Sequence, residues 1–157
     1  MSLQDWLSNG WLRKHKTSNQ EIINLLEIVK RDTQDAGFRE VSPDWRFGIA
    51  YNAALKLCTI LLFAEGYKPE RNLAHYRTIQ AMPLILGNHK EEDANYLDTC
   101  RNKRNIIEYD YAGGTTHIDA DELISLVSDL QDEVFVWLKN NHPKLLLANS
   151  KARSKKA

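Results

Sequence analysis

The segment spanning residues 98–114, DTCRNKRNIIEYDYAGG, holds the side chains best suited to chemistry in this chain. Each residue of an α-helix advances about 100° around the axis, so Arg101, Arg104 and Glu108 share a sector of about 60°. The polar and aromatic residues on or beside this face are Arg101, Arg104, Asn105, Glu108, Tyr109 and Tyr111. A guanidinium group is a planar fork that suits phosphate, so the face indicates an anion site. The alternative is a solvated surface whose Arg104–Glu108 pair contributes only about 0.3 kcal/mol.

The charge balance makes any attraction to phosphate a local property. Lys and Arg together number 21, as do Asp and Glu, so no global field draws the chain toward nucleic acid or membrane. The one strong asymmetry is a basic tail at the C-terminus, formed by Lys151, Arg153, Lys155 and Lys156. Such a tail either adds weak, salt-sensitive RNA binding or serves as a disordered solubilising end.

The cysteines and acidic residues predict neither a disulfide framework nor a metal site. Cys58 and Cys100 are isolated in apolar helical contexts, which favours buried thiols in a reducing compartment. The acids at 91–93 are consecutive and cannot share one helix face, so we expect no metal and no cofactor. The N-terminus lacks an unbroken apolar region, and the near-apolar run at 57–64 is shorter than the roughly 20 residues of a membrane span. We therefore expect a soluble cytoplasmic protein without a membrane partner.

Helical patterns follow one another along the chain and must position the 98–114 segment. The predicted helices cover residues 18–37, 43–65, 70–87, about 90–109 and 119–141. Capping boxes begin the first (Ser18, Glu21) and the last (Asp119, Glu122), and Pro43 begins the second. The 43–65 helix is apolar on nearly all sides, which is typical of the centre of a bundle or of a subunit interface.

The predicted fold is all-α, an antiparallel bundle of four to five helices. One domain covers residues 1–143, with its core at about 18–142, and a frayed tail with a mobile basic end covers 144–157. No β-alternating run or hairpin signal is visible. Pro83 should kink or shorten its helix, and Pro143 should end the last one. Most other aromatic residues are expected in the core, namely Trp45, Phe47, Tyr51, Phe135 and Trp137.

Arg104 and Asn105, followed by Tyr109 and Tyr111, resemble the signature of HEPN domains. These helical modules occur in toxin–antitoxin systems, CRISPR nucleases and RNA-processing proteins. Their signature is an Arg, usually a polar neighbour, and then a His; one branch extends it to Arg-x4-His-x-Tyr. Here Tyr109 occupies the His position, giving Arg-x4-Tyr-x-Tyr. The runs FGIAYNAALKLCTILLFAEGYKP and AHYRTIQAM are also similar to the family's central and following helices, so the HEPN-like resemblance covers about residues 18–140.

The resemblance implies a homodimer in which two Arg/His motifs cleave RNA without a metal. That chemistry needs a base to activate a ribose hydroxyl and an arginine to stabilise the phosphate charge. Tyr109 is a poor base because the reference pKa of tyrosine is about 10. His75 and His117 are the histidines that could replace the missing one, although a structural or surface role is expected for each. In the Arg-x4-His-x-Tyr branch, a partner nucleotidyltransferase acts as antitoxin by modifying the final tyrosine with AMP. Tyr111 matches that tyrosine, but the favoured interpretation is a tyrosine that closes the end of the helix.

Three functional hypotheses follow, in order of preference. The first is a HEPN-like homodimeric module, associated with a toxin–antitoxin pair, that binds RNA, a nucleotide or a partner protein through its arginine-rich face. The second is a metal-independent endoribonuclease that uses Arg104, Asn105 and Tyr109 with a non-standard base. The third is a non-catalytic structural protein whose arginines form intersubunit salt bridges. The remaining binding candidates are Arg101, Glu108, Tyr111 and His75.

Overall fold

The computed structural model describes residues 1–109 and 113–147, with no side-chain description for 107–109. These residues form six α-helices, two 3-10 helices and one two-stranded sheet, so the mostly helical prediction is confirmed. In chain order the elements are α1 (Leu3–Ser8), β1 (Leu12–Lys14), α2 (Asn19–Ala36), α3 (Pro43–Ala64), β2 (Tyr67–Pro69), α4 (Ala74–Leu86), η1 (Asn88–Lys90), α5 (Glu91–Tyr109), α6 (His117–Asn141) and η2 (Pro143–Leu146).

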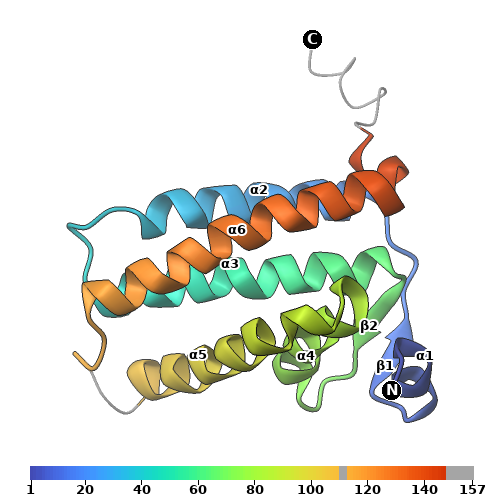
Figure 1. The fold of residues 1–157 in the computed structure, drawn as a ribbon, viewed down its shortest axis with the longest axis horizontal. Helices are drawn as coiled ribbons and strands as arrows, with labels where there is room; N and C mark the ends of the chain where they lie inside the picture. The colour runs from blue at the N-terminus through green and yellow to red at the C-terminus, as the bar shows by residue number, and fades with distance from the viewer. Residues whose placement is uncertain (110–112, 148–157) are drawn as a thin grey trace.

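Helix α3 lies at the centre of the bundle and contacts α2, α4, α5 and α6 (Figure 1). Its side chains Leu57, Ile60 and Leu61 are fully buried, as the apolar pattern of this helix predicts. By length and composition alone, α3 is the one helix in the described ranges that could cross a membrane. However, 67% of its most apolar stretch is buried inside the protein, which is typical of a core helix.

Hydroxyl caps set where the main helices begin. The Ser18 hydroxyl accepts a hydrogen bond from the Glu21 backbone N–H, and Ser42 caps α3 with Pro43 at its first position, as predicted. The predicted start of α6 is wrong by about two residues. Thr116 caps this helix and forms the capping box with Asp119, so Asp119 lies at the third helical position instead of starting the helix.

The N-terminal part of the chain forms structure that the sequence did not predict. β1 pairs antiparallel with β2, so residues 67–69 are a strand rather than a turn, and α4 begins at Ala74 instead of residue 70. Strands of three residues are too short to show alternation. A second apolar cluster, separate from the main core, attaches α1 and β1 to the bundle; its buried members are Trp6, Leu12, Leu62 and Ala81.

Pro83 and Pro143, which were predicted to shorten or end their helices, differ in their effect on the chain. Pro83 lies inside α4, which continues to Leu86, so this proline does not end the helix. Pro143 follows the end of α6 as predicted, but the chain then forms η2, which packs Leu145 and Leu146 against the main core. The residues directly after Pro143 thus form a short 3-10 helix whose two leucines are partly buried. Residues 148–157 of the predicted tail lie outside the described ranges.

A buried arginine joins three helices near the start of α3. Only 2% of Arg46 is exposed, and its Nε donates a hydrogen bond to the Ala36 carbonyl at 2.8 Å. Nη1 lies 2.8 Å from His117 Nδ1, and Nη2 donates to the Asp121 carboxylate at 2.6 Å. His117 is thus engaged with a structural arginine, 71 residues away in sequence, and its Nδ1 does not face the predicted anion site.

Two aromatic side chains expected in the core lie at the surface. Trp45 is 64% exposed and Phe135 is 46% exposed, whereas Phe47 and Tyr51 are buried as predicted. Trp45 lies on the side of α3 between α2 and α5, where it lines a cavity. Phe135 lines a groove between α2 and α6.

Candidate functional site

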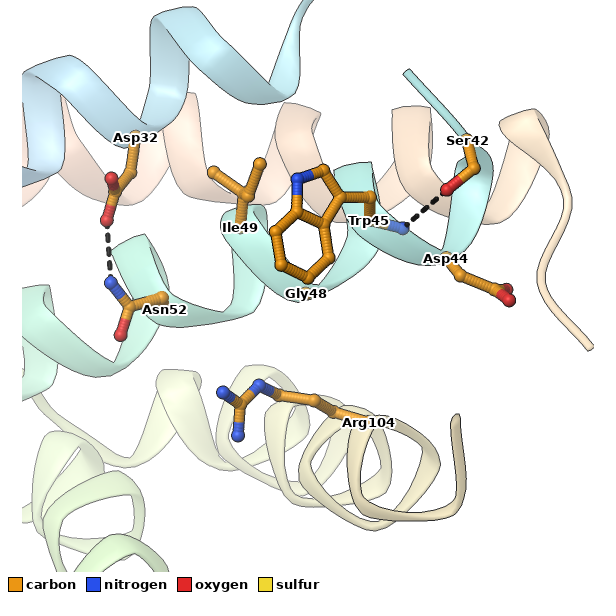
Figure 2. Close-up of a pocket in the computed structure, with 8 residues that line it drawn as sticks. All are labelled: Asp32, Ser42, Asp44, Trp45, Gly48, Ile49, Asn52 and Arg104. Carbon is orange, nitrogen blue, oxygen red and sulfur yellow. Dashed lines mark hydrogen bonds between the residues drawn. The ribbon is translucent and has the colours of Figure 1, made fainter. Parts of the chain in front are cut away.

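Arg104, the central residue of the predicted anion site, lines a cavity of about 470 Å³ (Figure 2). The cavity lies where α2, α3 and α5 meet, and its other lining residues are Asp32, Ser42, Asp44, Trp45, Gly48, Ile49 and Asn52. Figure 2 shows the Arg104 guanidinium pointing from α5 toward α3, below Gly48 and Ile49. Its central carbon lies 5.4 Å from the centre of the Tyr51 ring, within the range of a cation–π contact.

The acidic residues of this cavity are engaged with other groups. The buried Asp32 carboxylate accepts hydrogen bonds from Asn52 Nδ2 at 2.6 Å and from Arg31 Nη2 at 2.9 Å. Asp44 Oδ2 accepts a hydrogen bond from the Gly113 backbone N–H at 2.6 Å, whereas its Oδ1 is buried and has no partner within residues 1–109 and 113–147. The cavity thus holds Arg104 on α5 and two carboxylates on α2 and α3, and only its α5 side is suited to an anion.

Arg101 lies one helical turn before Arg104 and is held by an ion pair. Its Nε donates to the Asp98 carboxylate at 2.9 Å, and its guanidinium carbon lies 5.9 Å from the centre of the Tyr76 ring. Asn105 is exposed on the same helix. Arg101 is thus held in place on α5 with its positive charge partly balanced.

The structure brings His75 toward the two arginines, although it comes from a different helix. Burial lowers the pKa of His75 from its ordinary value of 6.5, and the positive charges of Arg104, Lys56 and Arg101 lower it further. Helices α3, α4 and α5 contact one another here, and the exposed His75 lines a cavity of about 270 Å³ together with Lys56, separate from the cavity of Arg104. We call Lys56, His75, Arg101 and Arg104 the basic cluster.

A buried phenol lies beside the basic cluster. Burial raises the pKa of Tyr51 to about 12, although Arg101 and Arg104 act in the opposite direction. The Tyr51 hydroxyl is buried and has no hydrogen-bond partner within residues 1–109 and 113–147. An unpartnered buried hydroxyl costs about 1–3 kcal/mol, so this group would be stabilised by an acceptor placed next to the arginines.

Several predicted site residues cannot be compared with the geometry. Glu108 and Tyr109 lie in α5, but their side chains are outside the description, as is the whole of Tyr111. Lys56 and Asn52 belong to the site and were not predicted. Their spacing could have identified them, because Gly48, Asn52 and Lys56 recur every four residues and so share one face of an otherwise apolar helix.

Replacing Gly48 by Ala is expected to stabilise the protein while narrowing the Arg104 cavity. Gly48 lies inside α3, and an added Cβ meets no atom within 4 Å. Alanine in a helix interior is favoured over glycine by about 0.5–1 kcal/mol. Urea unfolding should therefore show a higher midpoint, and ligand titration should show unchanged or weaker binding. A lower unfolding midpoint would contradict the open space at this position.

The described ranges, 1–109 and 113–147, contain no group of three or more His, Cys, Asp or Glu side chains that could hold a metal ion. Comparison with protein-family models, curated proteins and solved structures finds no match to the chain. The described residues thus offer Arg104 beside the buried Tyr51 phenol in one cavity, which Asp32 and Asp44 also line. Lys56 and His75 line a second cavity, on the α4 side.

Proposed function

We propose that this chain is a HEPN-like module that binds the phosphate groups of RNA or of a nucleotide through the basic cluster. The supporting observation is that α3, α4 and α5 contact one another where they carry Lys56, His75, Arg101 and Arg104, although the chain as a whole is neutral. The positive charges of these residues also act on His75. A local concentration of positive charge attracts phosphate where net charge does not. Arg104 would supply a planar pair of donors, and the Tyr51 hydroxyl an additional one.

The binding proposal is tested with a labelled single-stranded RNA of mixed sequence. Arg104→Ala is expected to weaken binding about tenfold and to reduce the slope of log affinity against log salt by about one. Arg104→Lys should be intermediate, because it keeps the charge and loses the fork. Arg13→Ala is the matched control: it removes the same charge from an exposed position on β1. Equal losses in Arg104→Ala and Arg13→Ala would refute a specific site.

RNA binding is expected to strengthen as the pH falls from about 7.5 to about 5.5, because of His75. In the free protein the pKa of His75 is lowered below 6.5. As the pH falls from 6.5 to the folded-state pKa, His75 is therefore protonated more in the unfolded chain than in the folded one. This difference lowers the free energy of unfolding in that pH range. A bound phosphate favours the charged imidazole and raises this pKa, so binding is coupled to proton uptake. NMR titration of His75 with and without RNA measures both values. His75→Asn should remove most of the pH dependence of RNA binding. If the variant binds RNA with the same pH dependence as the original chain, His75 is not at the site.

A second candidate function is metal-independent cleavage of RNA, with His75 as the base. A lowered pKa keeps the imidazole neutral at pH 7, as a general base requires, and Arg104 is near enough to influence it. Cleavage would then continue in EDTA and be lost in both His75→Asn and Arg104→Ala. If purified protein binds RNA and leaves it intact, the binding function stands and the nuclease does not.

We also propose that the module acts as a homodimer through the end of the bundle where α3 begins. The end of α2, the starts of α3 and α6 and the end of α5 lie at this end of the bundle (left in Figure 1). These segments carry four exposed apolar residues, namely Phe38, Trp45, Ile106 and Ile118. Two copies joined here would place their Arg104 cavities close to each other. Sedimentation of Ile118→Glu should show a monomer where the original chain is a dimer. A nucleotidyltransferase-type antitoxin is the partner that the HEPN-like motif suggests, and co-expression with one would test it.

A further inference from the structure

The small cavity that Lys56 and His75 line lies where the second half of α3, β2 and the start of α4 meet (Figure 1). We call it the Lys68 cavity, after the cationic side chain that β2 adds to it. Its apolar walls include Leu55, Leu62, Phe63 and Pro69. At about 270 Å³ it is smaller than the roughly 300–1,000 Å³ of sites for whole small molecules, so it suits one compact group of a ligand.

The ionisable side chains that line the Lys68 cavity are two lysines and a histidine. Lys56 comes from α3, Lys68 from β2 and His75 from α4. Among the residues that the structure describes, no carboxylate lines this cavity or pairs with either lysine. Glu65, at the end of α3, is instead 3.4 Å from Nε2 of His142. Charges of one sign thus meet here without an acid to balance them.

Lys68 is held in position by an aromatic ring instead of by an acid. Its Nζ lies 5.2 Å from the centre of the Phe63 ring, within the range of a cation–π contact. This contact leaves the N–H groups of the ammonium without an oxygen acceptor. His75 belongs to the first turn of α4, where the helix dipole adds positive charge to the same wall of the cavity.

We propose that the Lys68 cavity binds a phosphate group, at a position separate from that of Arg104. Phosphate carries more than one negative charge near pH 7, and its oxygens can accept hydrogen bonds from Lys56, Lys68 and His75 together. A carboxylate has a single charge and only two oxygens. The proposal extends the proposed function, on which it rests for Lys56 and His75, by adding Lys68 and a second phosphate position.

Inorganic phosphate is the first probe of the Lys68 cavity. Its titration at pH 7.5, with the ionic strength held constant by chloride, should shift the imidazole NMR signals of His75 saturably and leave the other histidines in place. Lys68→Gln should weaken this binding about tenfold, because it removes a charged hydrogen bond. Lys68→Arg keeps the charge and should retain most of the affinity. Lys139→Gln, at an exposed position on α6, is the matched control and should bind phosphate normally.

A second variant guards against a local effect on β2, because Lys68 also contacts Phe63. Lys56→Gln, on α3, should lose phosphate affinity to a similar extent, and circular dichroism shows whether each variant is folded. The proposal is overturned if tens of millimolar phosphate give no saturable shift of His75. It is also overturned if both lysine variants keep the original affinity.

A short single-stranded RNA distinguishes the source of the phosphate. If RNA supplies it, RNA displaces inorganic phosphate from the Lys68 cavity, and Lys68→Gln weakens RNA binding. If the ligand is free phosphate or a small phosphorylated molecule, Lys68→Gln binds RNA as the original chain does and loses inorganic phosphate alone. If Arg104→Ala weakens RNA binding but phosphate never shifts His75, the proposed function stands and the Lys68 cavity is not a phosphate site.

Discussion

Replacing Arg46 by Ala is expected to lower the free energy of unfolding by about 3 kcal/mol. The substitution removes a side chain that is only 2% exposed, leaves a cavity at the start of α3, and removes the donor to the Ala36 carbonyl. It also removes the polar contacts between α3 and α6, because His117 and Asp121 lose their buried partner. Guanidinium chloride unfolding followed by circular dichroism measures the loss.

Arg39→Ala is the matched control for this prediction. Arg39 donates to the same carboxylate, on Asp121, at 2.7 Å, but its side chain is 61% exposed. An exposed ion pair contributes about 0–1 kcal/mol, so the Arg39 variant should stay near the original stability. Similar losses in the two variants would show that burial of Arg46 is not the cause.

The same ion pairs predict how the stability changes in acid. The hydrogen bond from Arg39, and then that from Arg46, lowers the pKa of Asp121 from its ordinary value of 3.8. A lowered carboxyl pKa stabilises the fold above 3.8, and this contribution is lost as the pH falls through the folded-state pKa. The acid dependence should therefore be weaker in Arg46→Ala, and urea unfolding across this pH range would show it.

Replacing Gly87 by Ala is expected to cost about 2 kcal/mol, the second largest effect. Gly87 ends α4 with φ 121° and ψ 160°, a conformation that is essentially restricted to glycine. An added Cβ would also lie 2.9 Å from Nδ1 of His89. The backbone cannot relax freely, because the Gly87 N–H donates to the Pro83 carbonyl at 2.9 Å. Thermal unfolding gives the measurement.

Two further variants separate the causes of the Gly87 effect. Gly10→Ala, at φ 77° with no atom within 4 Å of the added Cβ, should cost about 1 kcal/mol, the penalty of a left-handed residue alone. In a His89→Ala background, Gly87→Ala should lose only the part of its cost that comes from the contact with the imidazole. A Gly87→Ala protein as stable as the original would contradict the backbone conformation at this turn.

Local signals in the sequence were sufficient for the long helices. Ser18 with Glu21, and Ser42 with Pro43, act within one turn of helix, so α2 and α3 could be placed from the sequence. Thr116 forms the same kind of cap with Asp119, and the pair Asp119 and Glu122, which has the same spacing, predicts a start three residues later. No comparable local signal marks β1, whose partner strand lies more than fifty residues away.

In the candidate site, too, the features that depend on one helix could be predicted from the sequence, whereas those that depend on packing between helices could not. The spacing of Arg101 and Arg104 along one helix is visible in the sequence, whereas the approach of His75 depends on how α4 packs against α5. The exposure of Trp45 depends on the space left between α2 and α5. Distances between helices follow from the packing of the whole core, which no local pattern contains.

The separate apolar cluster that attaches α1 and β1 has a consequence for how the native state opens. A unit joined to the bundle by four buried side chains and a two-stranded ribbon is held by less free energy than the main core. Its amide protons should therefore exchange with solvent through a partial unfolding that leaves α3 protected. Trp11 belongs to this unit and Arg77 does not, so the contact of the Arg77 guanidinium with the Trp11 ring, at 3.6 Å, is lost whenever the unit opens. Hydrogen exchange in β1 thus reports on how firmly that contact holds the N-terminal unit to α4.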